Sequence, residues 1–142
     1  HDFACARKAI EETARRGIRV GAHIILGLPG EDAEESLRQA PIISSLPLTT
    51  LKIHQLQIIR GTRLAKMYAE KPFHLYTVEE YIKLIADYIS LLRPDLVLER
   101  FVSQSPPDLL IAPKWGLKNY EFTHRLHNYM KEKLNNKAQS DK

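Results

Sequence analysis

A strand-like segment that ends in a glycine turn constrains the fold more than any other part of the chain. Residues 20–31 read V-G-A-H-I-I-L-G-L-P-G-E. Apolar residues without clean alternation indicate a strand covered on both faces, as in a parallel sheet. Gly27 and Gly30 allow close approach to the backbone, and the helix expected next would begin with unpaired amides that attract anions. The segment predicts either a ligand-binding turn or a turn that only reverses the chain.

Helical and strand patterns alternate along the chain, which predicts an α/β protein with parallel strands. Strands are predicted at residues 18–28, 51–59 and 96–102, and helices at 2–17, 32–40, 64–70, 77–93 and 117–134. Asp2 and Asp32 are expected to cap the first two helices, and Thr77 with Glu80 forms a capping box for the fourth. Pro41 is expected to kink or interrupt the second helix, and residues 135–142 are expected to form a frayed polar tail.

Composition narrows the classes of function. The formal net charge of +4 favours an anionic partner without requiring one. Cys5 is the only cysteine, so cysteines of this chain alone cannot form a disulfide or ligate an iron-sulfur cluster. The histidines lack the spacing of metal ligands, so we predict no metal site in this chain. No apolar run approaches the roughly 18 residues needed to cross a bilayer, which predicts a cytoplasmic location and no membrane partner.

Three blocks of sequence follow one another in an order typical of a known enzyme superfamily. They are R-G-I-R-V-G-A-H-I-I-L-G-L-P-G-E at 16–31, L-K-I-H-Q-L-Q-I-I-R-G-T-R-L-A at 51–65 and P-P-D-L-L-I-A-P-K-W at 106–115. Together they resemble a bacterial family of predicted iron-sulfur oxidoreductases in the radical S-adenosylmethionine (SAM) superfamily, related to the Elongator catalytic subunit. The resemblance covers residues 1–120, which is almost the whole chain.

The resemblance implies the C-terminal portion of a partial (β/α)6 TIM-like barrel with parallel strands. Residues 1–76 would supply the last two barrel strands with their helices, and residues 77–142 would form a family-specific extension that ends in a basic helix. A C-x-x-x-C-x-x-C loop that holds a 4Fe-4S cluster would lie in a missing N-terminal half. We therefore expect a truncated segment whose exposed sheet edge pairs with that half, or with a second copy in a homodimer.

The resemblance also implies an activity for the parent protein. In such enzymes the reduced cluster cleaves SAM to a 5'-deoxyadenosyl radical, which abstracts a hydrogen atom from the substrate. The parent is expected to be a radical SAM enzyme with an unknown substrate, and this chain alone is expected to be inactive. Two alternatives remain open: an RNA-binding module that uses the basic terminal helix with Lys131 and Lys133, and a free-standing nucleotide binder that uses Gly27 to Glu31.

The superfamily's cofactor motif, G-x-I-x-G-x-x-E, can be placed on the first strand and its turn. Ile25 and Gly27 match the motif, His23 replaces its first glycine, and Glu31 comes one residue late. The resemblance implies apolar contact with adenine through Ile25 and a close backbone at Gly27, with the end of the second strand near the adenine edge. The predicted SAM-binding residues are Ile25, Gly27, Leu28, Pro29, Gly30, Leu56 and Gln57.

Polar residues in or after otherwise apolar strands are the candidates for substrate contacts. His23 and His54 would each need a partner if buried, so each is either a site residue or a satisfied core residue. His54 and Gln55 are neighbours in one strand and cannot both line one cavity. Arg60 and Arg63 follow the end of that strand, where substrate contacts collect in parallel barrels, although a salt bridge to a nearby helix is the alternative. No catalytic residue is assigned.

Overall fold

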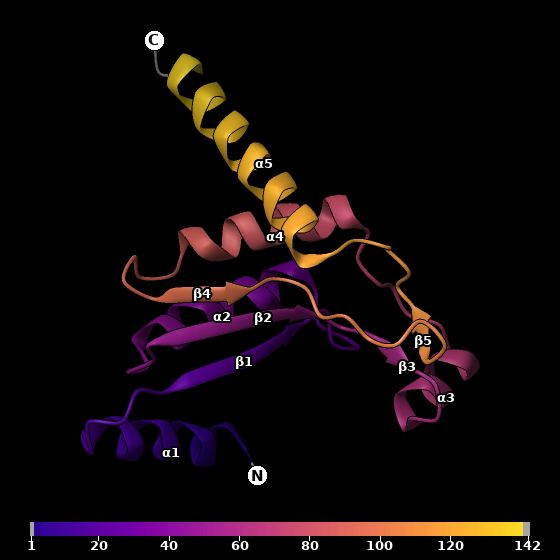
Figure 1. The fold of residues 1–142 in the computed structure, drawn as a ribbon, viewed down its shortest axis with the longest axis horizontal. Coiled ribbons are helices and arrows are strands. Elements are labelled where there is room, and N and C mark those ends of the chain that lie inside the picture. Colours follow the sequence, from indigo (N-terminus) through magenta and orange to yellow (C-terminus); the bar gives the residue numbers. More distant parts are fainter. Residues whose placement is uncertain (1, 141–142) are drawn as a thin grey trace.

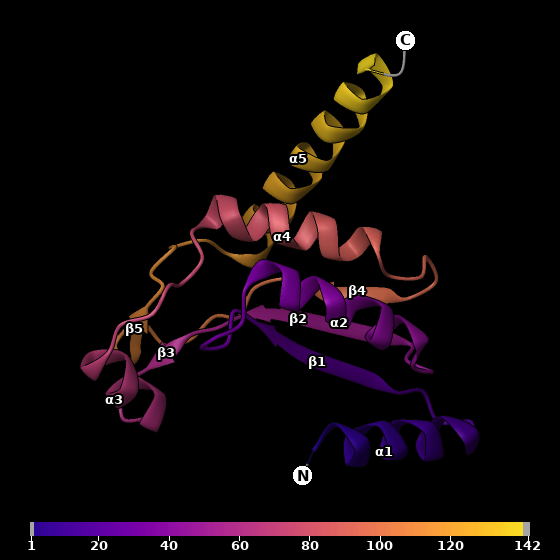
Figure 2. The same cartoon turned by 180° about the vertical axis from the view of Figure 1, so that it is seen from behind.

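A parallel sheet with helices packed on one face organises the structure, a computed structural model that describes residues 2–140 (Figures 1 and 2). The main sheet has the strand order β1-β2-β4, with β1 at Gly21–Leu26, β2 at Thr50–Gln55 and β4 at Val97–Arg100. β1 pairs in parallel with β2, from Gly21 opposite Thr50 to Leu26 opposite Gln55. β2 also pairs in parallel with β4, and an irregularity interrupts that register between Leu51 and Lys52.

The crossover helices bury one face of this sheet. α2 (Ala33–Ser45) connects β1 to β2, and α4 (Val78–Ser90) lies between β2 and β4 in the chain. Leu51 and Ile53 of β2 are fully buried in the core, whereas His54 and Lys52 on the other face are only partly covered. β1 shows the same alternation. The prediction that the first strand is covered on both faces is therefore wrong for this chain, because helices pack on one side alone.

The predicted helix starts are confirmed by their capping hydrogen bonds. Asp2 accepts from the backbone amide of Cys5 at 2.9 Å at the start of α1 (Phe3–Arg15), and Asp32 accepts from the amide of Glu35 at 2.7 Å. At α4 the amide of Glu80 donates to Thr77 Oγ1 at 3.2 Å, and the amide of Thr77 donates to Glu80 Oε2 at 2.8 Å. This reciprocal pair satisfies two backbone donors that the first turn leaves free.

Several predicted boundaries differ from the structure, three of them by more than the ends of an element. α2 runs through Pro41 to Ser45, since the missing proline amide costs one bond and the packing of Ala40 and Ile43 on the core holds the helix. The predicted strand 51–59 is divided, because the chain leaves the sheet after β2 and forms β3 (Ile58–Ile59), which pairs antiparallel with β5 (Leu110–Ala112). The predicted tail is helical through Ser140, and residues 141–142 lie outside the described residues.

Two further helices lie outside the main layer. α3 (Arg63–Glu70), capped by Thr62, sits beside β3 and β5 beyond the carboxyl end of the sheet (Figure 1). α5 (Asn119–Ser140) packs its first half on α4 through Phe122 and Leu126, which are almost fully buried. Its second half projects from the body (Figure 2), and residues 131–139 are all exposed. Within residues 2–140, no helix is both long and apolar enough to cross a membrane.

The described strands form an open sheet and no closed barrel. β1 is an edge strand that pairs only with β2 among residues 2–140, so its outer edge presents backbone groups without a strand partner. The α/β class and the parallel strands are confirmed.

One arginine fixes the connection between α2 and β2. The Arg93 side chain donates to the carbonyl oxygens of Ser44 at 3.3 Å, of Leu46 at 3.2 Å and of Leu48. Its backbone amide donates to Ser44 Oγ at 2.8 Å. These bonds satisfy carbonyls that the end of a helix leaves without partners.

We expect Arg93→Met to lower the free energy of unfolding by about 1–3 kcal/mol, because it removes the donors of three partly buried carbonyls. Arg38→Met is the matched control, since Arg38 is exposed on α2, where it pairs with Glu34 and Glu35, and its substitution should cost much less than that of Arg93. Urea denaturation measures both. Equal effects of the two substitutions would contradict the assigned role of Arg93.

Candidate functional site

The turn after β1 depends on two glycines for different reasons. Gly27 and Gly30 have φ angles of +86° and +83°, a region that favours glycine. A Cβ built on Gly27 would lie 2.9 Å from Cε2 of Tyr76, so the bare backbone is also needed to seat that ring. Within residues 2–140, and leaving out Gly30 and its two chain neighbours, no heavy atom lies within 4 Å of a Cβ built on Gly30. The Tyr76 ring therefore covers the turn at Gly27, whereas the turn is exposed at Gly30.

Apolar side chains line the open side of this turn. Ile25 is 48% exposed and Leu28 is 45% exposed, and Pro29 is also exposed. Ile25 lies on the same face of β1 as His23, because side chains two positions apart in a strand share a face. Exposed aliphatic groups beside a glycine turn form a surface suited to a ligand that has a flat apolar part.

The carboxylate of Glu31 accepts hydrogen bonds from two residues of α2. Its Oε1 accepts hydrogen bonds from Ser36 Oγ at 2.6 Å and from Gln39 Nε2 at 3.1 Å. Its backbone amide donates to the carbonyl of Leu28 at 2.9 Å and closes the turn. This carboxylate therefore fixes the turn to α2.

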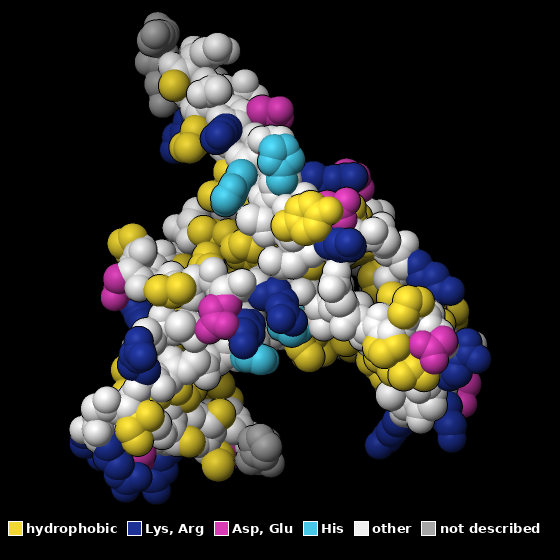
Figure 3. Space-filling model, in the orientation of Figure 1, with side chains coloured by type: hydrophobic (Ala, Val, Ile, Leu, Met, Phe, Trp, Pro, Cys, Tyr) yellow, Lys and Arg dark blue, Asp and Glu magenta, His cyan; other side chains and the backbone are white. Residues whose placement is uncertain are grey.

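The uncovered face of the sheet is polar. The rings of His23 and His54 stack with centroids 5.6 Å apart, and Lys52 Nζ lies 3.1 Å from Glu99 Oε2. Figure 3 shows histidine and charged side chains gathered over the strands on this face. His54 Nε2 is buried and has no hydrogen-bond partner within residues 2–140. Burial lowers the pKa of His54, and the charges of His23, Arg100 and Lys52 lower it further.

The end of β2 is tied to β1 and to a distant loop. Leu56 is almost buried, and its amide donates to the carbonyl of Leu26 at 3.0 Å. Gln57 Nε2 donates to the carbonyl of Ser103 at 3.2 Å, and its Oε1 accepts from Ser105 Oγ at 2.6 Å. Gln55 Nε2 donates to the same carbonyl at 3.1 Å and its Oε1 accepts from the Ser103 amide at 2.8 Å. We call this arrangement the glutamine clamp.

No local sequence pattern indicates the clamp's partners, because Ser103 and Ser105 lie 46 to 48 residues beyond the two glutamines. Tyr76 was missed for the same reason, since it reaches Gly27 only through the fold. The alternation of polar and apolar positions in β2 could have indicated that Gln55 faces the helices.

The structure brings some predicted residues together and separates others. His23, His54 and Ile25 share the uncovered face of the sheet, while the turn and Leu56 meet at its carboxyl edge. Arg60 and Arg63 lie apart, beside β3 and at the start of α3. Both are exposed, and neither forms an ion pair within the described part of the chain, so the predicted alternative of a salt bridge is not realised.

Residues 2–140 contain no group of three or more His, Cys, Asp or Glu side chains placed to hold a metal ion. Cys5 is exposed on α1. A 4Fe-4S cluster needs three or four thiolates, so the residues of this chain do not fit one.

Comparison with known proteins identifies the family. Residues 48–132 match the Radical_SAM C-terminal domain. The chain belongs to the radical SAM C-terminal domain family. The family resemblance predicted from the three sequence blocks is thereby confirmed.

The radical SAM relatives are longer than this chain. It is 31% identical to the uncharacterized protein YtqA of Bacillus subtilis over 85% of the chain, and 31% identical to the uncharacterized protein MJ0486 of Methanocaldococcus jannaschii over 94%. The matches span 38% and 42% of those two proteins. A tRNA uridine(34) acetyltransferase of Methanocaldococcus infernus is 26% identical over 94% of the chain.

A solved structure has the same fold. Elp3 of Methanocaldococcus infernus, with residues 1–46 deleted, superposes with a TM-score of 0.81 and 23% identity. The match covers 94% of this chain and 31% of that one. The α/β arrangement described above therefore corresponds to a part of a larger protein.

The lowered pKa of His54 predicts a loss of stability in mild acid. In the unfolded chain a histidine takes up a proton near pH 6.5, whereas folded His54 does so at lower pH. Between these two values the unfolded state binds more protons, so the free energy of unfolding should decrease as the pH falls below about 6.5.

Urea denaturation at pH 7 and pH 5 measures this loss. His54→Gln should reduce it, whereas His127→Gln, an exposed position on α5, should leave it unchanged. The same pH dependence in wild type and His54→Gln would show that His54 is not responsible.

Proposed function

We propose that this chain is the C-terminal part of a radical SAM enzyme and supplies one side of its SAM site. The observation that carries the proposal is the carboxyl edge of β1 and β2. There, a turn with two left-handed glycines adjoins the exposed side chains of Ile25 and Leu28, beside an uncovered polar sheet face. Ligands of parallel α/β proteins bind at the carboxyl ends of the strands. Membership of the radical SAM family supports SAM as this ligand.

The residues at this edge fit the nucleoside part of SAM. In the proposal, Ile25 and Leu28 pack against the adenine ring and exclude water from it. Pro29 stiffens the turn, Gly27 gives it a left-handed bend beneath the Tyr76 ring, and Gly30 lets the ligand reach the backbone. The backbone of Leu56 and Gln57 borders the adenine edge, and the Leu56 amide keeps this segment against the end of β1.

The cluster belongs to another part of the parent protein in this proposal, because the chain's residues do not fit it. When present, the cluster supplies the electron that cleaves SAM reductively. This chain's own residues bind and orient the nucleoside. His23 and His54 face the same side as Ile25, so they are the proposed substrate contacts. Arg60 and Arg63 remain predicted contacts for an anionic part of the substrate.

The uncovered edge of β1 supports a preceding barrel half as the chain's partner. A groove of about 330 Å³ lies along this edge between α1, β1 and α2. Phe3 and Ile42 line it and are 50% and 47% exposed. Relatives continue well beyond the matched region, which supports a parallel strand from the parent as the cover. In this proposal residues 1–76 form the end of a barrel and residues 77–142 an extension. A homodimer across the edge remains the prediction for the chain alone.

RNA binding is a second candidate function, favoured by the outer face of α5. Tyr120, His124, His127 and Lys131 are all exposed and spaced three or four residues apart, so they form one stripe along the helix. Stacking aromatics with cations suit single-stranded RNA. Lys133 is not part of the stripe, since it pairs with Asp87 of α4. The match to a tRNA-modifying acetyltransferase adds support. The free-standing nucleotide binder stays a prediction.

The test of the SAM site uses the full-length parent protein, with its cluster reconstituted under anaerobic conditions. We expect Ile25→Ser to raise the KM for SAM about tenfold in an assay of 5'-deoxyadenosine formation, because it removes the apolar contact to adenine. Ile18→Ser is the matched control. Ile18 is 57% exposed but precedes β1, at the opposite end of the strand, so its KM should not change.

The isolated chain should form no 5'-deoxyadenosine. Two outcomes would contradict the proposal: a reconstituted parent that forms none, or the same KM for Ile25→Ser and Ile18→Ser.

A further inference from the structure

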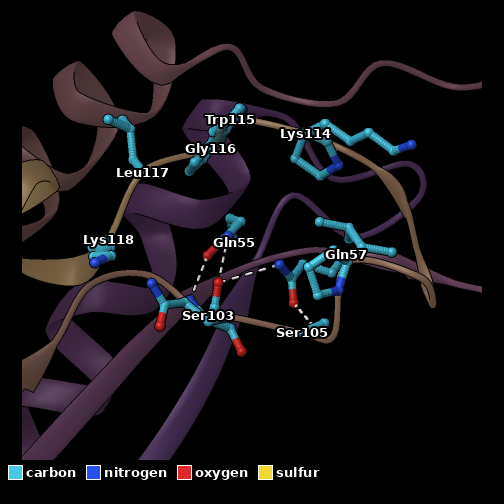
Figure 4. A pocket seen from close by; sticks show the side chains of 13 residues that line it. Gln55, Gln57, Ser103, Ser105, Lys114, Trp115, Gly116, Leu117 and Lys118 are labelled. Atoms are coloured by element: carbon cyan, nitrogen blue, oxygen red, sulfur yellow. Dashed lines mark hydrogen bonds between the residues drawn. The ribbon is translucent and has the colours of Figure 1, made fainter.

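A second cavity lies where the C-terminal extension crosses the end of β2. Its volume is about 510 Å³, within the range of small-molecule sites. The glutamine clamp forms its floor, and the segment from Pro113 to Lys118 forms the opposite wall (Figure 4). Gln55 faces the helix-covered side of the sheet, opposite to its neighbour His54. The cavity therefore does not share the polar sheet face on which the proposed substrate contacts lie.

The cavity wall is rigid and has flat apolar surfaces. Trp115 donates its ring N–H to the carbonyl of Tyr76 at 3.1 Å, and its ring is nearly parallel to that of Phe122, with centroids 6.3 Å apart. Pro107 and Pro113 also line the cavity, and their rings restrict the backbone there. A planar group can bind to such surfaces without the entropy cost of ordering flexible side chains.

The charged side chains that line the cavity are all positive. Lys114 and Lys118 line it and are exposed, and neither forms an ion pair within residues 2–140. Of the lining residues, all in the described part of the chain, none is acidic. The nearby Glu121 directs its carboxylate to the backbone amide of Lys118, at 2.7 Å. Two unpaired ammonium groups beside a low-dielectric wall attract an anion.

The floor adds hydrogen-bonding capacity. Each amide nitrogen of the clamp carries two N–H groups and gives one to the Ser103 carbonyl. Gln104 lines the same cavity with a further amide. Amides offer both donors and acceptors, so they suit a ligand with polar edges on a flat ring.

We propose that this cavity binds a planar anion: a ring stacked along the wall formed by Trp115 and the prolines, with its phosphate or carboxylate at Lys114 or at Lys118, which lie toward opposite ends of the cavity (Figure 4). The glutamine clamp fixes the floor on which the ring rests. This site shares one residue with the proposed SAM site. The backbone of Gln57 borders SAM in that proposal, whereas its side chain belongs to the glutamine clamp. It stands independently of the proposed function.

The experiment uses the fluorescence of Trp115, which is the only tryptophan in the chain. Uridine 5'-monophosphate and benzoate are the anionic probes, and uridine is the neutral control. At least one anion should quench the fluorescence saturably, while uridine should bind about tenfold more weakly than its monophosphate. Quenching by the nucleotide alone would identify a phosphate-bearing ligand, and quenching by benzoate alone a carboxylate-bearing one.

Charge-removing variants localise the binding. Either Lys114→Gln or Lys118→Gln should weaken it about tenfold, because the lysine that holds the anionic group donates a charge-assisted hydrogen bond that the variant lacks. Lys8→Gln, an exposed lysine on α1 outside the cavity, should bind like wild type. The proposal is overturned if neither anion quenches saturably, if uridine monophosphate binds but uridine binds as tightly, or if both lysine variants bind like wild type. The readout involves neither SAM nor 5'-deoxyadenosine, so it can fail or succeed separately from the proposed function.

Discussion

Burial of one face of the β1-β2-β4 sheet is the constraint on which the other features depend. Leu51 and Ile53 of β2 and Ile85 of α4 are fully buried together, which fixes the register of the strands against the helices. A one-residue shift would turn these side chains to solvent. The same alternation puts His54 and Lys52 on the uncovered face, and it turns Gln55 toward the extension. Both candidate sites are consequences of this register.

The glutamine clamp joins the sheet to the C-terminal extension. Four hydrogen bonds connect Gln55 and Gln57 to Ser103 and Ser105, while Tyr81 Oη donates to the carbonyl of Phe101 at 2.9 Å. Side-chain amides that are shielded from water need partners, and here the backbone of Ser103 and the hydroxyl of Ser105 provide them. The extension therefore has a fixed position over the end of β2, and the cavity between them has rigid walls.

The chain corresponds to one part of its longer relatives. It belongs to the radical SAM C-terminal domain family and covers about two fifths of the relatives YtqA and MJ0486. Its free strand edge, the apolar groove beside α1 and the polar sheet face all lie where further chain would adjoin β1. An open sheet of three strands leaves such surfaces uncovered, whereas a closed barrel has no strand edges.

The sequence by itself determined what depends on neighbours in the chain. Capping at Asp32 and Thr77, the glycine turn after β1 and the parallel α/β order all follow from local patterns. Only the tertiary structure decided that Pro41 lies within a helix, that residues 58–59 join β5, and that Gln57 holds a loop 46 residues away. The physical reason is that these outcomes depend on contacts between distant segments, whose packing and hydrogen bonds outweigh local preference. No pattern within a short window of sequence contains them.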